Sequence, residues 1–163
     1  MAITRLNNNS ITSITALPSA VAVDNTPAFR VNNTGGDQQI SDQTLTRISY
    51  TNKLHDTDDA FDLSSNTFTV PSGKAGKYFF HVSGALNTGT DFEGNELQIR
   101  VNGNATLVTR VRNEYYDSMS AEVVVNLSVG DVVDAAITHS FGSTLAWRNA
   151  TNENTFGGFR LIE

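Results

Sequence analysis

The pair Asn102-Gly103 lies between two runs in which apolar and polar residues alternate. Residues 96–101 read Glu-Leu-Gln-Ile-Arg-Val, and residues 105–111 read Ala-Thr-Leu-Val-Thr-Arg-Val. An Asn-Gly pair in this setting is the strongest short-range signal of a β-hairpin, because both residues tolerate the positive φ of a tight hairpin turn. We therefore predict two antiparallel strands here, with the apolar residues of the first run facing the core.

Similar alternation, with turn residues at short intervals, continues over most of the chain after residue 26. Residues 76–86 predict a strand with large side chains on both faces, which indicates that both faces are covered. Residues 121–129 and 132–138 predict a second hairpin around Gly130-Asp131, and residues 158–162 predict a last strand. No window predicts an amphipathic helix, so the pattern favours an all-β sandwich or barrel.

Composition agrees with one domain rich in turns and exposed strands. The chain has 163 residues, of which 17% are charged, against roughly 25% in an average soluble domain. Its net charge of −6 argues against a nucleic-acid partner, which requires a basic face. Cysteine is absent, which excludes disulfides and thiolate metal sites. No apolar run approaches a membrane span, and the first residues do not predict a signal peptide.

Residues 1–26 differ from the remainder, since they are rich in Asn, Ser, Thr and Ala. We predict an N-terminal segment over 1–26 and a folded domain over 27–163. The segment is either a disordered tail or an arm that becomes ordered only on a partner, such as another subunit or a capsid. Isolated apolar positions favour the attachment arm: Ile3, Leu6, Ile11, Ile14 and Leu17.

Five motifs follow one another along residues 27–162. They are residues 28–31 (Ala-Phe-Arg-Val), the acidic stretch 52–62 that ends in Phe-Asp, residues 68–80 (Phe-Thr-Val-Pro, a turn, then Gly-Lys-Tyr-Phe-Phe), residues 127–131 (Leu-Ser-Val-Gly-Asp) and residues 156–161 (Phe-Gly-Gly-Phe-Arg-Leu). In this order they resemble the jelly rolls of the complement component 1q and tumour necrosis factor superfamily. The chain departs from that pattern in a longer turn at 72–75, in lacking the family's cysteines and in lacking a collagen-like stalk.

The resemblance implies an all-β, ten-strand antiparallel jelly-roll sandwich assembled as a three-fold homotrimer. Self-association would cover the second face of a sheet that is apolar on both sides. The resemblance places four residues at the trimer interface: Phe79, His81, Phe159 and Leu161. Phe159 and Leu161 could alternatively be ordinary core residues. Four others are expected in the core: Tyr78, Phe80, Val125 and Leu127.

The Asn-Asn-Asn-Ser opening and the Ile-Thr-Ser-Ile-Thr that follows are similar to short bacteriophage structural proteins. This similarity implies a protein made in the host cytoplasm and placed on the virion surface, with the arm attached to major capsid or tail proteins. Capsid decoration is the favoured role. The alternatives are a receptor-binding knob of a tail or head fibre, a secreted carbohydrate-binding module whose partner is a host-surface glycan, and, with least support, a hydrolase.

The sequence contains no recognisable nucleophile elbow, phosphate loop or zinc-protease motif, so we expect neither enzymatic activity nor a cofactor. The predicted loop around Trp147 and Arg148, together with Tyr115 and Tyr116, is a candidate surface for a sugar or protein partner. Trp147 could instead plug one end of the sandwich. The carboxylates of Asp56, Asp58 and Asp59 are a weak calcium candidate, the alternative being a solvated turn.

Overall fold

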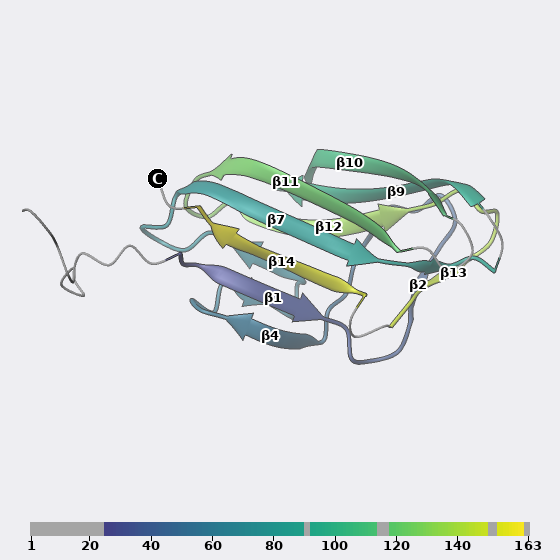
Figure 1. Ribbon diagram of the computed structural model, residues 1–163, viewed down its shortest axis with the longest axis horizontal. Helices are drawn as coiled ribbons and strands as arrows, with labels where there is room; N and C mark the ends of the chain where they lie inside the picture. Colours follow the sequence, from purple (N-terminus) through teal and green to yellow (C-terminus); the bar gives the residue numbers. More distant parts are fainter. Residues whose placement is uncertain (1–24, 90–91, 114–117, 150–152, 162–163) are drawn as a thin grey trace, which may run out of the picture.

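The computed structural model describes residues 25–89, 92–113, 118–149 and 153–161, which form fourteen β-strands and no helix (Figure 1). The strands are β1 (Ala28–Asn32), β2 (Gln38–Ile40), β3 (Thr46–Arg47), β4 (Asn52–Asp56), β5 (Phe61–Asp62), β6 (Thr67–Thr69), β7 (Gly76–Gly84), β8 (Leu86–Asn87), β9 (Phe92–Val101), β10 (Asn104–Asn113), β11 (Met119–Leu127), β12 (Val132–Thr138), β13 (Leu145–Trp147) and β14 (Thr155–Arg160). Accordingly, these ranges contain no candidate membrane-spanning helix.

Two antiparallel sheets pack face to face. One has five strands in the order β11-β7-β14-β1-β4, and its long central strands lie side by side in Figure 1. The other has the order β10-β9-β12-β6-β5, with β3 pairing alongside β12. The predicted antiparallel sandwich is therefore confirmed, although several short strands raise the number above the ten expected.

The predicted hairpin at Asn102-Gly103 is present and joins β9 to β10. Asn102 and Gly103 have φ values of 52° and 78°, the left-handed region that such a two-residue turn requires. The predicted inward orientation of this strand is also confirmed, because Leu97 and Ile99 are fully buried. Local sequence was sufficient here because the turn and both strands are contiguous in the chain.

The second predicted hairpin was wrong. β11 pairs with β7 in one sheet, whereas β12 pairs with β9, β6 and β3 in the other. The turn between β11 and β12 is held by a third segment: Gly130 N–H donates to the Val70 carbonyl and Val70 N–H donates to the Asp131 carbonyl, each over 3.0 Å. These bonds to Val70 anchor the turn where the chain crosses from one sheet to the other.

Aromatic rings fill the space between the two sheets. The Phe29 ring stacks on Phe61 and Phe68, with centroids 5.1 and 4.9 Å away, and meets Phe156 edge-on at 5.2 Å. Among the residues expected in the core, Tyr78, Phe80 and Leu127 are buried. Val125 is only partly buried and packs against the core from β11, which is the edge strand of its sheet. Burial of these rings is the main force that holds the sheets together.

A small third sheet, in the order β2-β13-β8, contains Trp147 at the end of β13. The Trp147 side chain is fully buried, and its ring lies directly over Gly84, where a Cβ atom would approach Trp147 Cζ2 to 2.0 Å. The expectation of a surface loop at Trp147 was therefore wrong, and the alternative that it plugs the sandwich fits. The loop prediction failed because β13 has only three residues, and its partners, β2 and β8, lie far away in the sequence.

Candidate functional site

The outer face of the five-stranded sheet carries its side chains in rows that run across the strands. Directly paired residues of antiparallel strands point to the same side of a sheet. We call one set the apolar row: Val124 on β11, Phe79 on β7 and Phe159 on β14. We call the next set the charged row: Glu122 on β11, His81 on β7, Gly157 on β14, Arg30 on β1 and His55 on β4.

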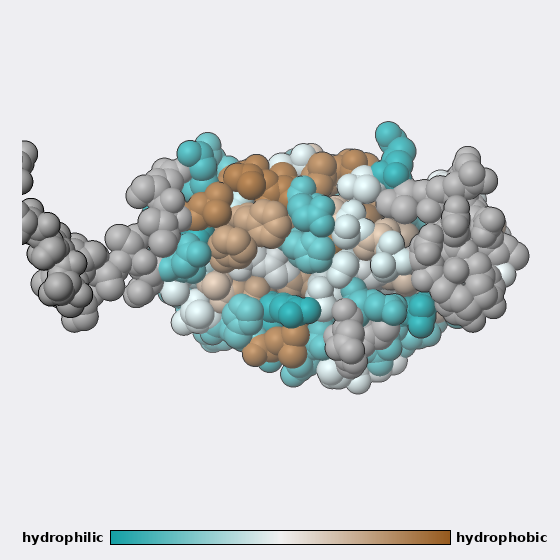
Figure 2. Space-filling model, viewed as in Figure 1, coloured by the Kyte–Doolittle hydropathy of each residue, from teal (hydrophilic) through white to brown (hydrophobic). Residues whose placement is uncertain are grey.

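The apolar row is exposed to solvent. Val124 is 57% exposed and Phe159 is 36% exposed, while Phe79 is half-buried. The Phe79 and Phe159 rings touch, with centroids 5.4 Å apart. Figure 2 shows hydrophobic atoms gathered at the end of this face where β7, β11 and β14 lie side by side. The three side chains therefore form one contiguous apolar surface.

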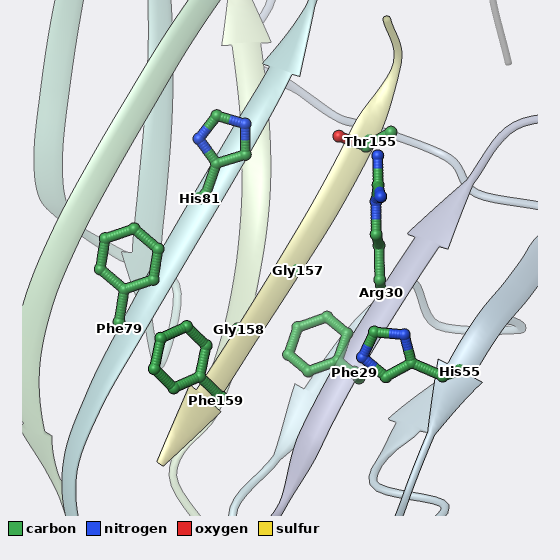
Figure 3. Close-up of a pocket in the computed structure, with 9 residues that line it drawn as sticks. All are labelled: Phe29, Arg30, His55, Phe79, His81, Thr155, Gly157, Gly158 and Phe159. Carbon is green, nitrogen blue, oxygen red and sulfur yellow. The ribbon is translucent and has the colours of Figure 1, made fainter. Parts of the chain in front are cut away.

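A hollow of about 220 Å³ opens beside the apolar row, in the region of Gly157 (Figure 3). Because Gly157 has no side chain, the position between His81 and Arg30 in the charged row is empty. The neighbouring Gly158 faces the interior of the sandwich, where a Cβ atom would approach Phe80 Cδ1 to 2.5 Å. The two adjacent glycines thus allow close packing inside the sandwich and a depression outside it.

The charged row is only partly paired within the chain. His81 Nδ1 lies 3.0 Å from Glu122 Oε1. The exposed Arg30 guanidinium, in contrast, makes no hydrogen bond or ion pair with another described side chain. His55 lies next to Arg30 in the register and is also exposed. The β1 side of the face therefore carries the Arg30 charge with no side-chain partner among the described residues, and the β11 side carries a carboxylate.

The structure brings together three of the four residues expected at a trimer interface. Phe79, His81 and Phe159 all line the hollow. Phe159 lies outside the core, which contradicts its alternative interpretation as an ordinary core residue. Leu161 follows β14 and is half-buried, with its N–H donating to the Lys77 carbonyl over 2.8 Å.

Sequence analysis did not place five residues of this face at an interface: Arg30, His55, Glu122, Val124 and Gly157. The alternation of inward and outward residues along β11 could have identified Glu122 and Val124, because they alternate with the inward-facing Ala121 and Val123. Arg30 could have been found in the same way, between the buried Phe29 and Val31. The hollow at Gly157 had no local signal, because it depends on which strands flank β14.

The other candidate surfaces have less support. Arg148 is 3.5 Å from Glu153 in an ion pair, beside the buried Trp147. Tyr115 and Tyr116 lie outside the described residues, as do the five apolar positions of the predicted arm.

The carboxylates of the acidic turn form hydrogen bonds and ion pairs with neighbouring residues of the same chain. Asp56 accepts hydrogen bonds from the backbone N–H groups of Ala60 and Phe61 and pairs with Lys53 over 2.9 Å. Asp59 also pairs with Lys53, and Asp58 lies 3.8 Å from Lys74. Over the described ranges no group of three acidic or histidine side chains is arranged to hold a metal ion. This arrangement fits the solvated turn better than the calcium site.

Comparison with known proteins identifies the fold. No protein-family model matches the chain, and no curated protein matches it. Among solved structures, the globular domain of zebrafish complement 1qA is similar, with a TM-score of 0.57, 22% identity, and coverage of 84% of this chain and 98% of that one.

Murine APRIL is similar as well. Its structure at pH 8.5 has a TM-score of 0.59 and 15% identity, and its structure at pH 5.0 has a TM-score of 0.60 and 14% identity. Each covers 82% of this chain and 98% of the murine chain. These similarities confirm the jelly-roll fold, which the chain shares with the complement 1qA domain and with APRIL.

Proposed function

We propose that this chain is a non-enzymatic structural module that self-associates as a homotrimer through the outer face of its five-stranded sheet. One observation carries the proposal: the apolar row of Val124, Phe79 and Phe159 lies exposed beside a hollow. A contiguous apolar surface of this kind, rimmed by charged groups, is typical of a protein–protein interface. A three-fold closure is what the superfamily resemblance of the sequence implies.

The surroundings of the histidines support a role without catalysis. His139 is buried, with Nε2 3.0 Å from the Ile40 carbonyl oxygen and Nδ1 accepting from Phe141 N–H over 3.4 Å. His81 contacts the carboxylate of Glu122, and no serine, threonine or lysine is hydrogen-bonded to it in the described part of the chain. Because no nucleophile is hydrogen-bonded to either of these two histidines among the described residues, acyl transfer through them has no support.

For the biological setting, we propose a bacteriophage virion surface, with the N-terminal segment attaching the trimer to a major capsid or tail protein. The support is the composition of residues 1–26, where isolated apolar residues interrupt a polar segment. A receptor-binding knob remains the alternative. A carbohydrate-binding module has lost its main support, because the Trp147 ring is buried and cannot stack on a sugar at the surface.

Light scattering on the full chain at neutral pH tests the self-association. We expect a mass near three times 17.6 kDa for the wild type and near one chain for F79S/F159S. V108S, an exposed valine on β10 of the other sheet, is the control and should keep the wild-type mass. A monomeric wild type, or a double variant that assembles like the wild type, would show that the proposed interface is wrong.

Deleting residues 1–26 tests the attachment. We expect the truncated protein to remain a trimer of the shortened chain and to lose binding to purified virions from which the full-length protein was removed. Loss of the trimer itself would place the segment in the assembly rather than in attachment. Unchanged binding to virions would contradict an attachment arm.

A further inference from the structure

The outer face of the five-stranded sheet is electrically asymmetric along the charged row. Glu122 is on β11 at one edge, whereas Arg30 is on β1, next to β4 at the opposite edge. Three strand spacings separate β11 from β1, or about 14 Å at about 4.8 Å per spacing. Glu122 and Arg30 therefore point to the same side without forming an ion pair within one chain, and Glu122 contacts the intervening His81 instead.

Each of these two groups can bind one more partner. The Arg30 guanidinium has five N–H donors and no side-chain partner among the described residues. The Glu122 carboxylate contacts His81 through Oε1, and a carboxylate accepts from several donors at once. An arginine and a carboxylate form strong, directional hydrogen bonds when they meet at an interface. The face is thus complementary to a second copy of itself.

The row arrangement determines how two copies can meet. Rotation about an axis parallel to the strands leaves the height of each residue along that axis unchanged. Residues of one row in one copy therefore meet residues of the same row in the next copy. If two copies are related by such an axis and the β11 edge of one faces the β1–β4 side of the next, Glu122 lies level with Arg30 and Val124 lies level with Phe159.

Shape supports the same contact. β11 is the edge strand of this sheet, and Val124 projects from it with 57% of its surface exposed. The hollow lies toward β14 and β1, with Gly157 between His81 and Arg30 (Figure 3). Because Glu122 and Gly157 belong to the same row, the Glu122 side chain of one copy can enter this depression in the next, while Val124 lies against the apolar row.

We infer that the β11 edge of one copy packs into the hollow of the next, with Glu122 forming an ion pair with Arg30 of the partner subunit. The inference rests on the proposed self-association and adds its direction and its specific charge pair. A charge pair of this kind fixes the register of an interface and excludes wrong alignments.

A charge swap tests the pair. We expect R30E and E122R each to raise the concentration at which the assembly dissociates by about 10- to 100-fold, because each places like charges opposite one another. We expect the double variant R30E/E122R to return to within a few-fold of the wild type, since it restores opposite charges. The measurement is light scattering or sedimentation over a dilution series. Recovery would report contact between copies, because the two positions are about 14 Å apart in one chain.

Two controls make the result specific. R110E breaks the exposed Arg110–Glu96 pair on the other sheet, where the two atoms are 2.8 Å apart, and should leave the association unchanged. H81A removes the intrachain contact of Glu122 and should have a smaller effect than E122R.

The outcomes separate the two proposals. Two results would show that the Glu122–Arg30 pair is wrong while self-association stands. One is that the wild type and the single variants assemble equally well. The other is that the double variant dissociates at a concentration as high as the two single effects combined would give. If the wild type is a monomer at all concentrations, the proposed function fails together with the pair.

Discussion

The outer faces of the two sheets differ in how many of their side chains find partners within the chain. On the outside of the six-stranded sheet, the Asp134 side chain is 2% exposed and pairs with Arg47 over 2.7 Å and with Arg100 over 2.6 Å. On the outside of the five-stranded sheet, Val124 and Phe159 are exposed to solvent, and Arg30 has no partner among the described side chains. Both sheets have the same alternating pattern, yet on the five-stranded sheet the outer-face charges pair within the chain only in part, through His81 and Glu122.

This difference indicates which face the proposed partner would cover. Charges paired within one chain stabilise a face that can remain in water. An exposed apolar row beside an unpaired charge leaves contacts that a second molecule can make. Substitutions on the six-stranded face should therefore change the free energy of unfolding, and substitutions on the five-stranded face should change the association.

The largest effect is expected on the free energy of unfolding when Asp134 is replaced. D134A should lower the free energy of unfolding by about 3–5 kcal/mol, because it leaves Arg100, only 12% exposed, without its counter-charge. Urea denaturation at fixed protein concentration measures this loss. D134N, which keeps the volume and part of the hydrogen bonding, should lose less. A loss below about 1 kcal/mol would mean that Arg47 and Arg100 find other partners and that this face is less dependent on the pairs than we infer.

A matched pair of valines compares the two faces directly. V124D should weaken association by about 10- to 100-fold, because binding would bury a carboxylate in an apolar contact. V108D, at a valine that is 39% exposed on β10, should leave association unchanged. Both variants should keep the circular dichroism of the wild type. Equal effects of V124D and V108D on the assembled mass would remove the distinction between the two faces.

The smallest effect is expected at Asp131, where the chain crosses between the sheets. The hydrogen bond from the Asn102 side chain, and then that from Ser128 N–H, lower the pKa of Asp131 below its ordinary value of 3.8. Because the pKa of Asp131 is lower in the folded state than in the unfolded state, the ionised carboxylate stabilises the fold at pH values above 3.8. This contribution is lost as the pH falls through the folded-state pKa. D131A should therefore destabilise the protein at pH 7, by about 0.5 kcal/mol for an exposed turn bond.

Thermal unfolding at several pH values tests this sign. The difference between D131A and the wild type should shrink as the pH falls below 3.8. A difference that stays constant from pH 7 to pH 3 would show that the ionised carboxylate is not what stabilises the turn.

Sequence reasoning succeeded where the signal was local. The Asn102-Gly103 turn directly joins the two strands that it pairs. In residues 76–86 the alternation separates the inward-facing Tyr78 and Phe80 from the outward-facing Phe79 and His81, as the structure has them. The period of a strand determines which of its residues share a side, because successive side chains point to opposite faces. The candidate interface could be proposed from this period together with the family resemblance.

Only the tertiary structure decided which strands are neighbours. Pairing of β14 with both β7 and β1 creates the hollow at Gly157, and pairing of β13 with β2 and β8 buries Trp147. The separation of β11 from β12 depends on hydrogen bonds to Val70, about sixty residues away in the chain. Alternation determined the two sides of each strand, but the choice of partner depends on contacts between distant segments, and no short window of sequence contains both sides of such a contact.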